Sequence, residues 1–295
     1  MLPKFLKPFH ISKSNLIRIG PKTDGGYIVD KRIFNRTDTL ITCGLNDDWE
    51  FEKSFLKKNK KFKIFAYDHT VTKEFWLSRF KKDIVSLLLL KKIKIGKILD
   101  VFKYIDYRLF FRNNKKHFEK KIVFKEKGNE ETTIPRIINN HNKVVLKIDI
   151  EGDEYKILND IKKNSKKIFF LLIEFHNVHK NLIKIRNFIR KSDLKIIHIH
   201  ANNYGGIDKN GNPKVIELSM LNSKKIKLNC LIFGDGPETK KYKDLSKKLK
   251  LHDKIIIFGD GKNCPQDINN IAKEASTICS ELLTHIGYRV NREYN

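Results

Sequence analysis

The sequence lacks an apolar run long enough to cross a membrane. The longest candidate, Ile84–Leu90, is broken by Ser86 and flanked by lysines, whereas a membrane-spanning helix needs about 20 apolar residues. The amino-terminal segment contains Pro3 and Pro8 and no sustained apolar stretch of the kind found in a secretory signal. We therefore expect no transmembrane segment and residence in the cytoplasm.

Cysteine is scarce, and a GxGxxG dinucleotide fingerprint is missing. No CxxC pair occurs among the four cysteines, which are Cys43, Cys230, Cys264 and Cys279. Their spacing disfavours a zinc cluster and fits a reducing compartment. Acidic residues are also in short supply, since 61 Lys and Arg stand against 34 Asp and Glu, a net charge of +27.

That positive charge raises nucleic acid or an anionic membrane as a partner. The basic residues are mostly lysine, spread over the whole chain, and no recognition motif with interleaved aromatic residues accompanies them. A compositional bias of the source genome explains this pattern equally well, so we expect no nucleic-acid partner. A peripheral contact with an anionic membrane surface stays open, and so does a non-catalytic, basic surface-binding protein.

Short apolar runs alternate with amphipathic segments, which is typical of an α/β fold with helical crossovers. The expected strands are Thr39–Gly44, Phe62–Tyr67, Val144–Ile150, Ile168–Phe175, Lys195–His200 and Lys214–Leu221, with helices at Asp153–Lys163 and His179–Ser192 and a hairpin within Ile17–Asp30. Basic helical material over residues 70–121 predicts an insertion, either a mobile lid or a cap packed on the core. We expect one domain over residues 1–225 and a small β-α-β appendage over 226–295.

The first candidate site follows an expected strand that ends at Gly44. The acids after this glycine would repel a pyrophosphate, but they would attract the sulfonium and amino groups of S-adenosylmethionine. Asp68 ends the next strand, where an acid can accept both ribose hydroxyls. The candidate cofactor residues are Gly44, Asp48, Glu52 and Asp68, with helix capping as the alternative role for the acids near Gly44.

A second group of polar residues follows the later strands. Lys147, Asp149 and Glu151 alternate with apolar residues, which predicts a polar cleft at the end of a central strand, or alternatively the solvated face of an edge strand. We expect three successive strands to bring together the candidate catalytic residues Asp149, Glu174, His176 and His200. One of them could act as a general base, and histidine titrates nearest to neutral pH. A carboxylate and imidazole cluster could also hold Mg²⁺ or Mn²⁺, whereas a structural role is the alternative for His198 or His200.

The strings IRIGPKTDGGYIVD, LITCGLNDDWEFE, FAYDHT, LKIDIEGDEYKIL, LLIEFHNVHKNL, HIHANNYGG and PKVIELSML, in this order, resemble the FkbM-like methyltransferases. The resemblance implies a Rossmann-like fold, S-adenosylmethionine as the cofactor, and O-methylation of a sugar hydroxyl in a polysaccharide, a glycolipid or a related metabolite. It places Gly44 and Asp48 in the cofactor loop, Asp68 at the ribose, and Asp149 with Glu151 beside the methyl group. We expect acceptor contacts from Asp24, Tyr27, Asn202 and Asn203.

The carboxyl-terminal tail resembles a different family of proteins. The string LIFGDGPETKKYKDLSKKLKLHDKIIIFGD resembles the phosphate-binding part of the carboxyl-terminal domain of GT-B glycosyltransferases. Residues 264–295 are too few to supply the further elements of a sugar-nucleotide site, so we interpret the tail as a fragment or a packing unit. The alternative function is a glycosyltransferase that uses the Gly234–Glu238 loop.

Overall fold

The computed structural model describes residues 3–9, 11, 13–22, 25–88, 95–222, 230–233 and 255–258. The chain divides into two units, residues 1–222 and 223–295. Within the second unit, the described strands β12 (Cys230–Phe233) and β13 (Ile255–Phe258) pair in parallel. The Gly234–Glu238 loop and the helices expected within the tail lie outside the described residues.

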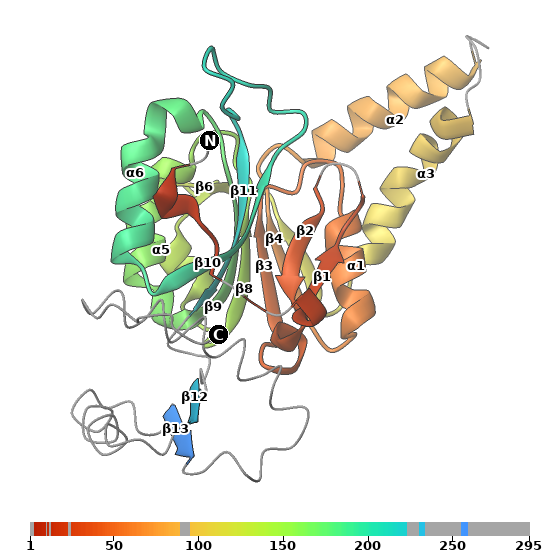
Figure 1. The fold of residues 1–295 in the computed structure, drawn as a ribbon. Helices are drawn as coiled ribbons and strands as arrows, with labels where there is room; N and C mark the ends of the chain where they lie inside the picture. The colour runs from red at the N-terminus through yellow and green to blue at the C-terminus, as the bar shows by residue number, and fades with distance from the viewer. Residues whose placement is uncertain are drawn as a thin grey trace. The chain divides into compact units, whose positions relative to one another are not determined.

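A seven-stranded sheet forms the centre of the first unit, in the order β10-β11-β9-β8-β3-β4-β5 (Figure 1). The strands are β3 (Thr39–Cys43), β4 (Lys63–Tyr67), β5 (Lys115–Phe118), β8 (Val144–Ile148), β9 (Ile168–Phe175), β10 (Leu194–Ala201) and β11 (Ile216–Asn222). All neighbours are parallel except β11, which runs antiparallel to β9 and β10. The expected α/β fold with a mostly parallel sheet is therefore confirmed.

The chain reverses its direction of travel across the sheet at the β3–β8 pair. From β3 it moves outward to β4 and β5, and then it returns to β8 on the other side of β3. In open parallel sheets, ligands bind beyond the carboxyl ends of the strands at such a switch point. The residues that follow β3 and β8 are therefore the first place to look for a site.

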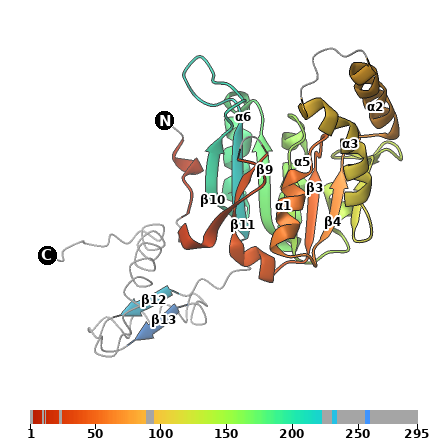
Figure 2. The ribbon, with the colours of Figure 1, turned by 90° about the vertical axis from the view of Figure 1, so that its right-hand side faces the viewer.

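Helices cover both faces of the sheet (Figures 1 and 2). One face carries α4 (Ile134–Ile138), α5 (Glu154–Lys163) and α6 (Val178–Lys191), and the other carries α1 (Glu50–Lys58) and the antiparallel hairpin of β1 (Leu16–Ile19) and β2 (Tyr27–Asp30). The core under α5 and α6 contains Ile157, Ile161 and Ile185, packed against apolar side chains of β8 and β9. Short 3₁₀ turns occupy Lys4–Leu6, Lys13–Asn15, Lys31–Asn35 and Ser165–Lys167, and β6 (Lys121–Ile122) pairs with β7 (Glu131–Thr132).

The segment expected to be a helical insertion forms two helices and one strand. Helices α2 (Lys73–Leu88) and α3 (Ile95–Phe110) pack against each other and project from the sheet (Figures 1 and 2). The end of the segment is not helical as expected, because β5 pairs with β4 as an edge strand. No described helix is long and apolar enough to span a bilayer.

Two expectations about the strands are wrong in detail. Strand β8 ends at Ile148, two residues before the expected end, because Glu151 and Gly152 adopt positive φ angles and turn the chain. Strand β10 does not lie beside β9, because β11 is inserted between them. Strand β8 itself lies between β3 and β9, so the alternative of a solvated edge strand is excluded.

Gly44 brings the ends of β3 and β8 into contact. Its φ angle is +86°, and a Cβ atom there would lie 1.6 Å from the carbonyl oxygen of Asp149. The Asp149 amide donates to the carbonyl of Cys43 at 2.9 Å, and the Gly44 amide donates to the carbonyl of Tyr67, also at 2.9 Å. Three strand ends are thus joined at one residue that tolerates no side chain.

We predict that Gly44→Ala lowers the free energy of unfolding by about 3 kcal/mol or more, because the added methyl group must push β8 away from β3. Urea denaturation followed by circular dichroism measures this change. Gly128→Ala is the matched control, because a Cβ atom at Gly128 meets nothing within 4 Å. Equal stabilities of the two variants would contradict the prediction.

Candidate functional site

Asp68 holds the loop that follows β3. Its Oδ2 atom accepts hydrogen bonds from the amides of Leu45 and Asn46, both at 2.8 Å. Its Oδ1 atom accepts from the amide and the hydroxyl of Thr70, at 2.7 and 2.6 Å. Burial alone would raise the pKa of Asp68, but these hydrogen bonds outweigh it and lower the pKa. Asp68 is therefore a carboxylate that fixes the loop after Gly44.

The other acids of this loop have different surroundings. Asp48 is exposed, and its Oδ1 atom accepts from the amide of Glu50 at 2.8 Å, which is the capping role considered above. Glu52 is fully buried and accepts from the hydroxyl of Thr42 at 2.8 Å, and burial raises its pKa. Glu52 is enclosed by protein, so it is not placed as the expected cofactor contact. Its hydrogen bond with Thr42 instead joins α1 to the end of β3.

The base of the α2–α3 pair is attached to the same loop. Asp47 forms ion pairs with Arg79 of α2 and with Lys103 of α3. Lys53 of α1 pairs with Asp106 of α3 at 2.6 Å. An apolar cluster surrounds these ion pairs and consists of Leu45, Trp49, Ala66, Val71 and Trp76, with Phe75, Tyr107, Phe110 and Phe111 packed against it. The base of the helical pair and the loop after Gly44 therefore position each other.

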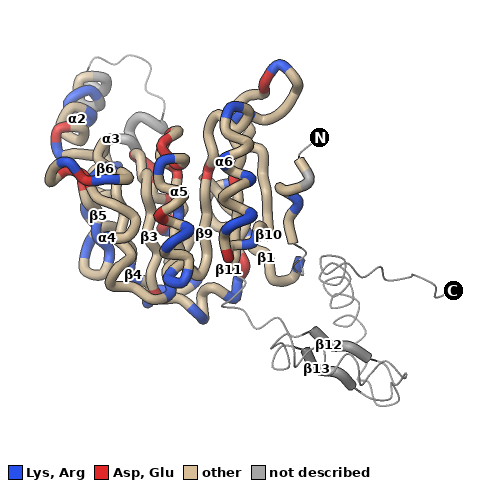
Figure 3. The backbone as a smooth tube through the Cα atoms, turned by 90° about the vertical axis from the view of Figure 1, so that its left-hand side faces the viewer, with Lys and Arg blue, Asp and Glu red and all other residues tan. Residues whose placement is uncertain are grey.

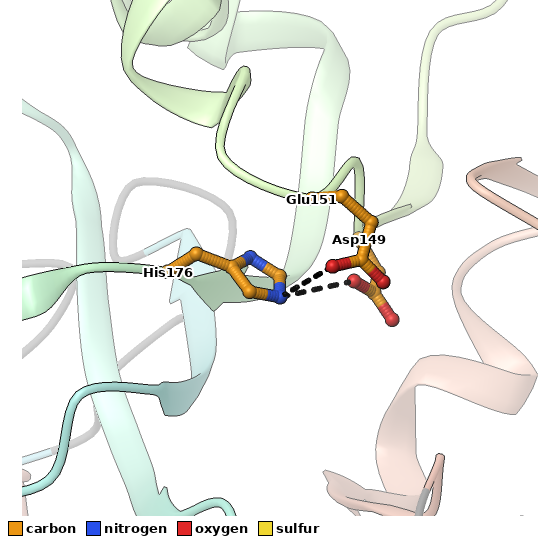
Figure 4. Close-up of side chains that lie close together, drawn as sticks. All are labelled: Asp149, Glu151 and His176. Carbon is orange, nitrogen blue, oxygen red and sulfur yellow. Dashed lines mark ion pairs between the residues drawn. The ribbon is translucent and has the colours of Figure 1, made fainter. Parts of the chain in front are cut away.

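His176 lies at the centre of an acidic cluster beyond β8 and β9. Its Nδ1 atom is 2.8 Å from Oε1 of Glu154, and its Nε2 atom faces Oε2 of Glu151 at 3.3 Å and Oδ1 of Asp149 at 4.0 Å. Figure 4 shows Asp149 and Glu151 pointing toward the same ring nitrogen. The Nε2 atom is also 3.5 Å from Oε1 of Glu174. The expected proximity of His176, Asp149 and Glu174 is present in the structure.

This cluster determines the charge of its members. Burial by itself would lower the pKa of His176, but the hydrogen bond to Glu154 and the negative charges around the ring raise it to about 9. His176 therefore carries a proton at neutral pH. Burial raises the pKa of Asp149, whose Oδ1 atom is buried and has no hydrogen-bond partner among the described residues. The histidine holds its proton, and Asp149 is the stronger candidate for accepting one.

A second group of polar side chains continues from Glu174 across β11 to β10. Cross-strand pairing places Glu217 opposite both Glu174 and His200. The Asn202 amide donates to Glu174 at 3.2 Å and to Glu217 at 3.4 Å, and Nδ1 of His200 is 3.4 Å from Oε2 of Glu217. His200 is thus separated from the Asp149 cluster by one strand more than expected. Glu217 occupies the place between them.

The expected acceptor residues are only partly brought together. We call the polar side chains along the ends of β8, β9, β11 and β10 the polar rim. The hydroxyl of Tyr27 donates to Glu174 of this rim at 3.4 Å, so the β1–β2 hairpin reaches it. Asn202 is buried in that rim, whereas Asn203 is exposed beside it. Asp24 lies outside the described residues. Lys147 is almost buried beneath the rim, with its ammonium group over the rings of Tyr27 and Phe51.

Two residues of this region were not singled out from the sequence. Glu154 is fully buried and orients His176, and its Oε1 atom also accepts from the amide of Gly152 at 2.9 Å. It opens helix α5, where an acid normally indicates capping. Glu217 lies inside the apolar strand β11, where a single acid bordered by apolar residues was the one available signal.

The geometry also permits a divalent cation at one place. One ligand atom from each of Asp149, Glu151 and His176 lies within 4.8 Å of the others. The hydrogen bond from the other ring nitrogen of His176 to Glu154 is the arrangement that usually orients a metal-binding histidine. The proton on His176 balances the same carboxylates without a metal, so the metal stays a prediction.

The fold is that of an α/β protein with polar side chains gathered beyond the carboxyl ends of β3, β8 and β9. The family model of the methyltransferase FkbM domain matches residues 29–196. That match spans more than half of the chain, and the protein belongs to the FkbM methyltransferase family. No curated protein matches the sequence.

Similar solved structures are all distant in sequence. The tRNA (uracil-54, C5)-methyltransferase of Pyrococcus abyssi, in complex with S-adenosyl-L-homocysteine, is 9% identical, with 70% of this chain and 44% of that chain covered and a TM-score of 0.31. A 30S ribosomal A1408 methyltransferase from an uncultured bacterium is 8% identical, with 70% and 100% covered and a TM-score of 0.32. The Methanococcus jannaschii fibrillarin pre-rRNA processing protein is 8% identical, with 64% and 67% covered and a TM-score of 0.31. The chain thus spans less than half of the Pyrococcus enzyme.

We predict that His176 makes stability depend on pH in a defined window. Its pKa rises from 6.5 in the unfolded chain to about 9 in the folded protein. The stabilising contribution of His176 to the free energy of unfolding is therefore complete below pH 6.5 and is lost as the pH rises through about 9. Relative to His176→Gln, the wild type should lose on the order of 2 kcal/mol of unfolding free energy across this window.

Urea denaturation at several pH values, in EDTA, measures this difference. His69→Gln is the matched control, because His69 is an exposed histidine outside the acidic cluster. A wild-type advantage over His176→Gln that stays constant from pH 6 to about pH 9 would refute the prediction.

Proposed function

We propose that this protein transfers the methyl group of S-adenosylmethionine to a hydroxyl group of a sugar. Membership of the FkbM methyltransferase family supports methyl transfer. The observation that carries the choice of site is the close approach of Gly44 to the backbone of Asp149, because it brings the ends of β3 and β8 together at the switch point, where open parallel sheets bind ligands. Acids on both sides of this point suit a cofactor with a positive charge.

The residues present fit this cofactor. Gly44 lets the ends of β3 and β8 meet, and Asp68 fixes the amides of the loop that follows it. Asp149 contributes a buried carboxylate oxygen without a hydrogen-bond partner among the described residues, directly at the strand end. When bound, S-adenosylmethionine supplies an electrophilic methyl group on a positively charged sulfur. We assign the cofactor loop to the residues after Gly44, the ribose side to Asp68, and the neighbourhood of the sulfonium to Asp149.

Side chains of this protein then remove the proton of the acceptor hydroxyl. Bound S-adenosylmethionine would supply the methyl group and would leave as a neutral thioether, while residues of this chain orient the acceptor oxygen and receive its proton. Asp149 takes the hydroxyl proton, since its unpaired oxygen lies at the strand end and His176 already holds a proton. His176, held by Glu154, offsets the negative charge of Asp149 before the transfer. Most of the acceleration comes from positioning the two reactants.

The rim beyond Asp149 supports a sugar as the acceptor. Glu174, Asn202 and Glu217 offer carboxylate and amide groups along neighbouring strands, and Tyr27 reaches them from the hairpin. Sugar hydroxyls both donate and accept hydrogen bonds, so a rim of carboxylates and an amide can orient several of them. We therefore assign the acceptor to this rim and the cofactor to the side of Asp68.

We predict that the wild type binds S-adenosylmethionine and that Asp68→Asn binds it at least about tenfold more weakly, because the amide oxygen and nitrogen cannot reproduce the carboxylate contacts to the loop amides. Isothermal titration calorimetry measures both affinities. Asp208→Asn is the matched control, since Asp208 likewise accepts from backbone amides but lies in a distant exposed turn. The cofactor assignment is wrong if the wild type does not bind, or if Asp68→Asn binds equally well.

We further predict that Asp149→Asn loses about 10²-fold or more of its turnover at saturating cofactor, since an amide cannot accept the proton. Radiolabelled methyl transfer into glycolipid and polysaccharide fractions of cell extracts measures turnover. Glu130→Gln serves as the control variant, because Glu130 is exposed. Label that appears in the protein or RNA fraction instead would contradict a sugar acceptor. Activity that vanishes with EDTA and returns with Mn²⁺ would show that the reaction needs a divalent cation.

A further inference from the structure

The α2–α3 pair exposes large apolar side chains away from its anchored base. On α3, Phe102, Ile105 and Leu109 are 56%, 52% and 54% exposed. They are spaced by three and four residues, so they lie on one face of the helix. Tyr107 and Phe111 belong to the opposite face and pack into the cluster at the base. The exposed stripe is therefore not needed to hold α3 in place.

Helix α2 shows the same division. Trp76 is buried in the base, whereas Leu77 is 60% exposed and Val85 is 52% exposed. Phe80 is 40% exposed on the same side as Leu77. An apolar surface on two adjacent helices of one projection is unusual for a protein surface, and such patches mark interaction sites. We call the side chains of Leu77, Phe80, Val85, Phe102, Ile105 and Leu109 the apolar stripe.

Basic side chains accompany the apolar stripe. Lys81 and Lys82 on α2 are exposed, and Arg108 on α3 is exposed beside Leu109. Within the part of the chain that the structure describes, none of these three forms an ion pair with an acid. The sequence that joins the two helices, residues 89–94, consists of leucine, isoleucine and lysine. Helices of this composition favour the boundary between water and an anionic bilayer.

A basic hollow lies where α3 meets β5. Its volume is about 440 Å³, and the basic side chains in its wall belong to Arg108, Arg112, Lys115 and Lys116. The wall also contains Tyr107, Phe118 and a single acid, Glu119, against the four basic side chains. Guanidinium and ammonium groups are the usual partners of phosphate groups. The hollow is therefore suited to the phosphate of a lipid headgroup, next to the helix that carries part of the apolar stripe.

Charge alone does not single out this region. Lys and Arg also line α6 on the far side of the sheet (Figure 3). The α2–α3 pair differs because its exposed basic groups accompany exposed aromatic and aliphatic side chains. A second copy of the chain is a poor occupant of the apolar stripe, since each copy carries a net charge of +27 and would bring like charges together. Anionic phospholipid complements both the charge and the apolar surface.

We propose that the apolar stripe and the basic hollow bind the surface of an anionic phospholipid bilayer. Helix α2 follows the carboxyl end of β4, and the residues of the candidate site follow the carboxyl ends of β3, β8 and β9. Parallel strands end at the same edge of a sheet, so the projection rises from the edge that carries the site (Figures 1 and 2). Docking through α2 and α3 thus brings this edge close to the membrane.

Co-sedimentation of the full chain with vesicles tests the proposal without any cofactor. Vesicles of phosphatidylcholine with phosphatidylglycerol should bind the wild type, whereas vesicles of phosphatidylcholine alone should not. We predict that Phe102→Ser with Ile105→Ser weakens binding about tenfold or more. Phe9→Ser with Ile183→Ser is the matched control, because this phenylalanine and isoleucine are also exposed but lie away from the α2–α3 pair. The control should bind like the wild type.

A charge-reversal pair tests the hollow separately. Arg108→Glu with Lys116→Glu should weaken binding about tenfold or more, and Lys180→Glu with Arg186→Glu on α6 should reduce it much less. Thermal denaturation checks that every variant folds. The proposal fails if the wild type does not sediment with anionic vesicles, or if the stripe and control variants bind alike. It also fails if light scattering shows a dimer that the stripe variant converts to a monomer, because the apolar stripe would then bind a second copy.

Discussion

The contact between Gly44 and the carbonyl oxygen of Asp149 sets the distance between the two strands at which the sheet changes direction. With no side chain at Gly44, the amide of Asp149 reaches the carbonyl of Cys43, and the amide of Gly44 reaches β4. The loop after Gly44 is then within reach of Asp68, which fixes two of its amides. The base of the α2–α3 pair rests on this loop through Asp47. A local backbone constraint therefore extends to the loop after Gly44 and to the projecting helices.

The electrostatic character of the rim is opposite to that of the whole chain. A protein with a net charge of +27 gathers carboxylates around one protonated histidine at the edge of its sheet. Buried carboxylates are costly unless a positive charge or hydrogen bonds compensate them. His176 supplies the charge for the Asp149 cluster, and Asn202 supplies hydrogen bonds for Glu174 and Glu217. The carboxylates of the rim are therefore compensated by specific partners, and their excess over basic groups distinguishes the rim from the basic surface elsewhere.

Much of the sheet could be predicted because its strands are rich in Ile, Val, Leu and Phe and are buried on both faces. Strand β5, with the sequence KKHF, could not, because its lysines carry no strand signal and its place depends on pairing with β4. The same limit applies to the site. Asp149 and His176 stand out in the sequence. The connection of His200 to Glu174 through Glu217 does not, because it depends on the antiparallel pairing of β11 with β9 and β10, which the pattern of residues does not specify.

Strand β11 also has a consequence for how the chain is made. It pairs with both β9 and β10 and places Glu217 between Glu174 and His200. A nascent chain that ends before β11 leaves β9 and β10 with open hydrogen-bonding edges, which invite pairing with other chains. Such a chain also lacks one wall of the rim. Because synthesis proceeds from the amino terminus, the part of the rim that contains Glu217 is assembled last, after the Gly44 loop and the Asp149 cluster have been translated.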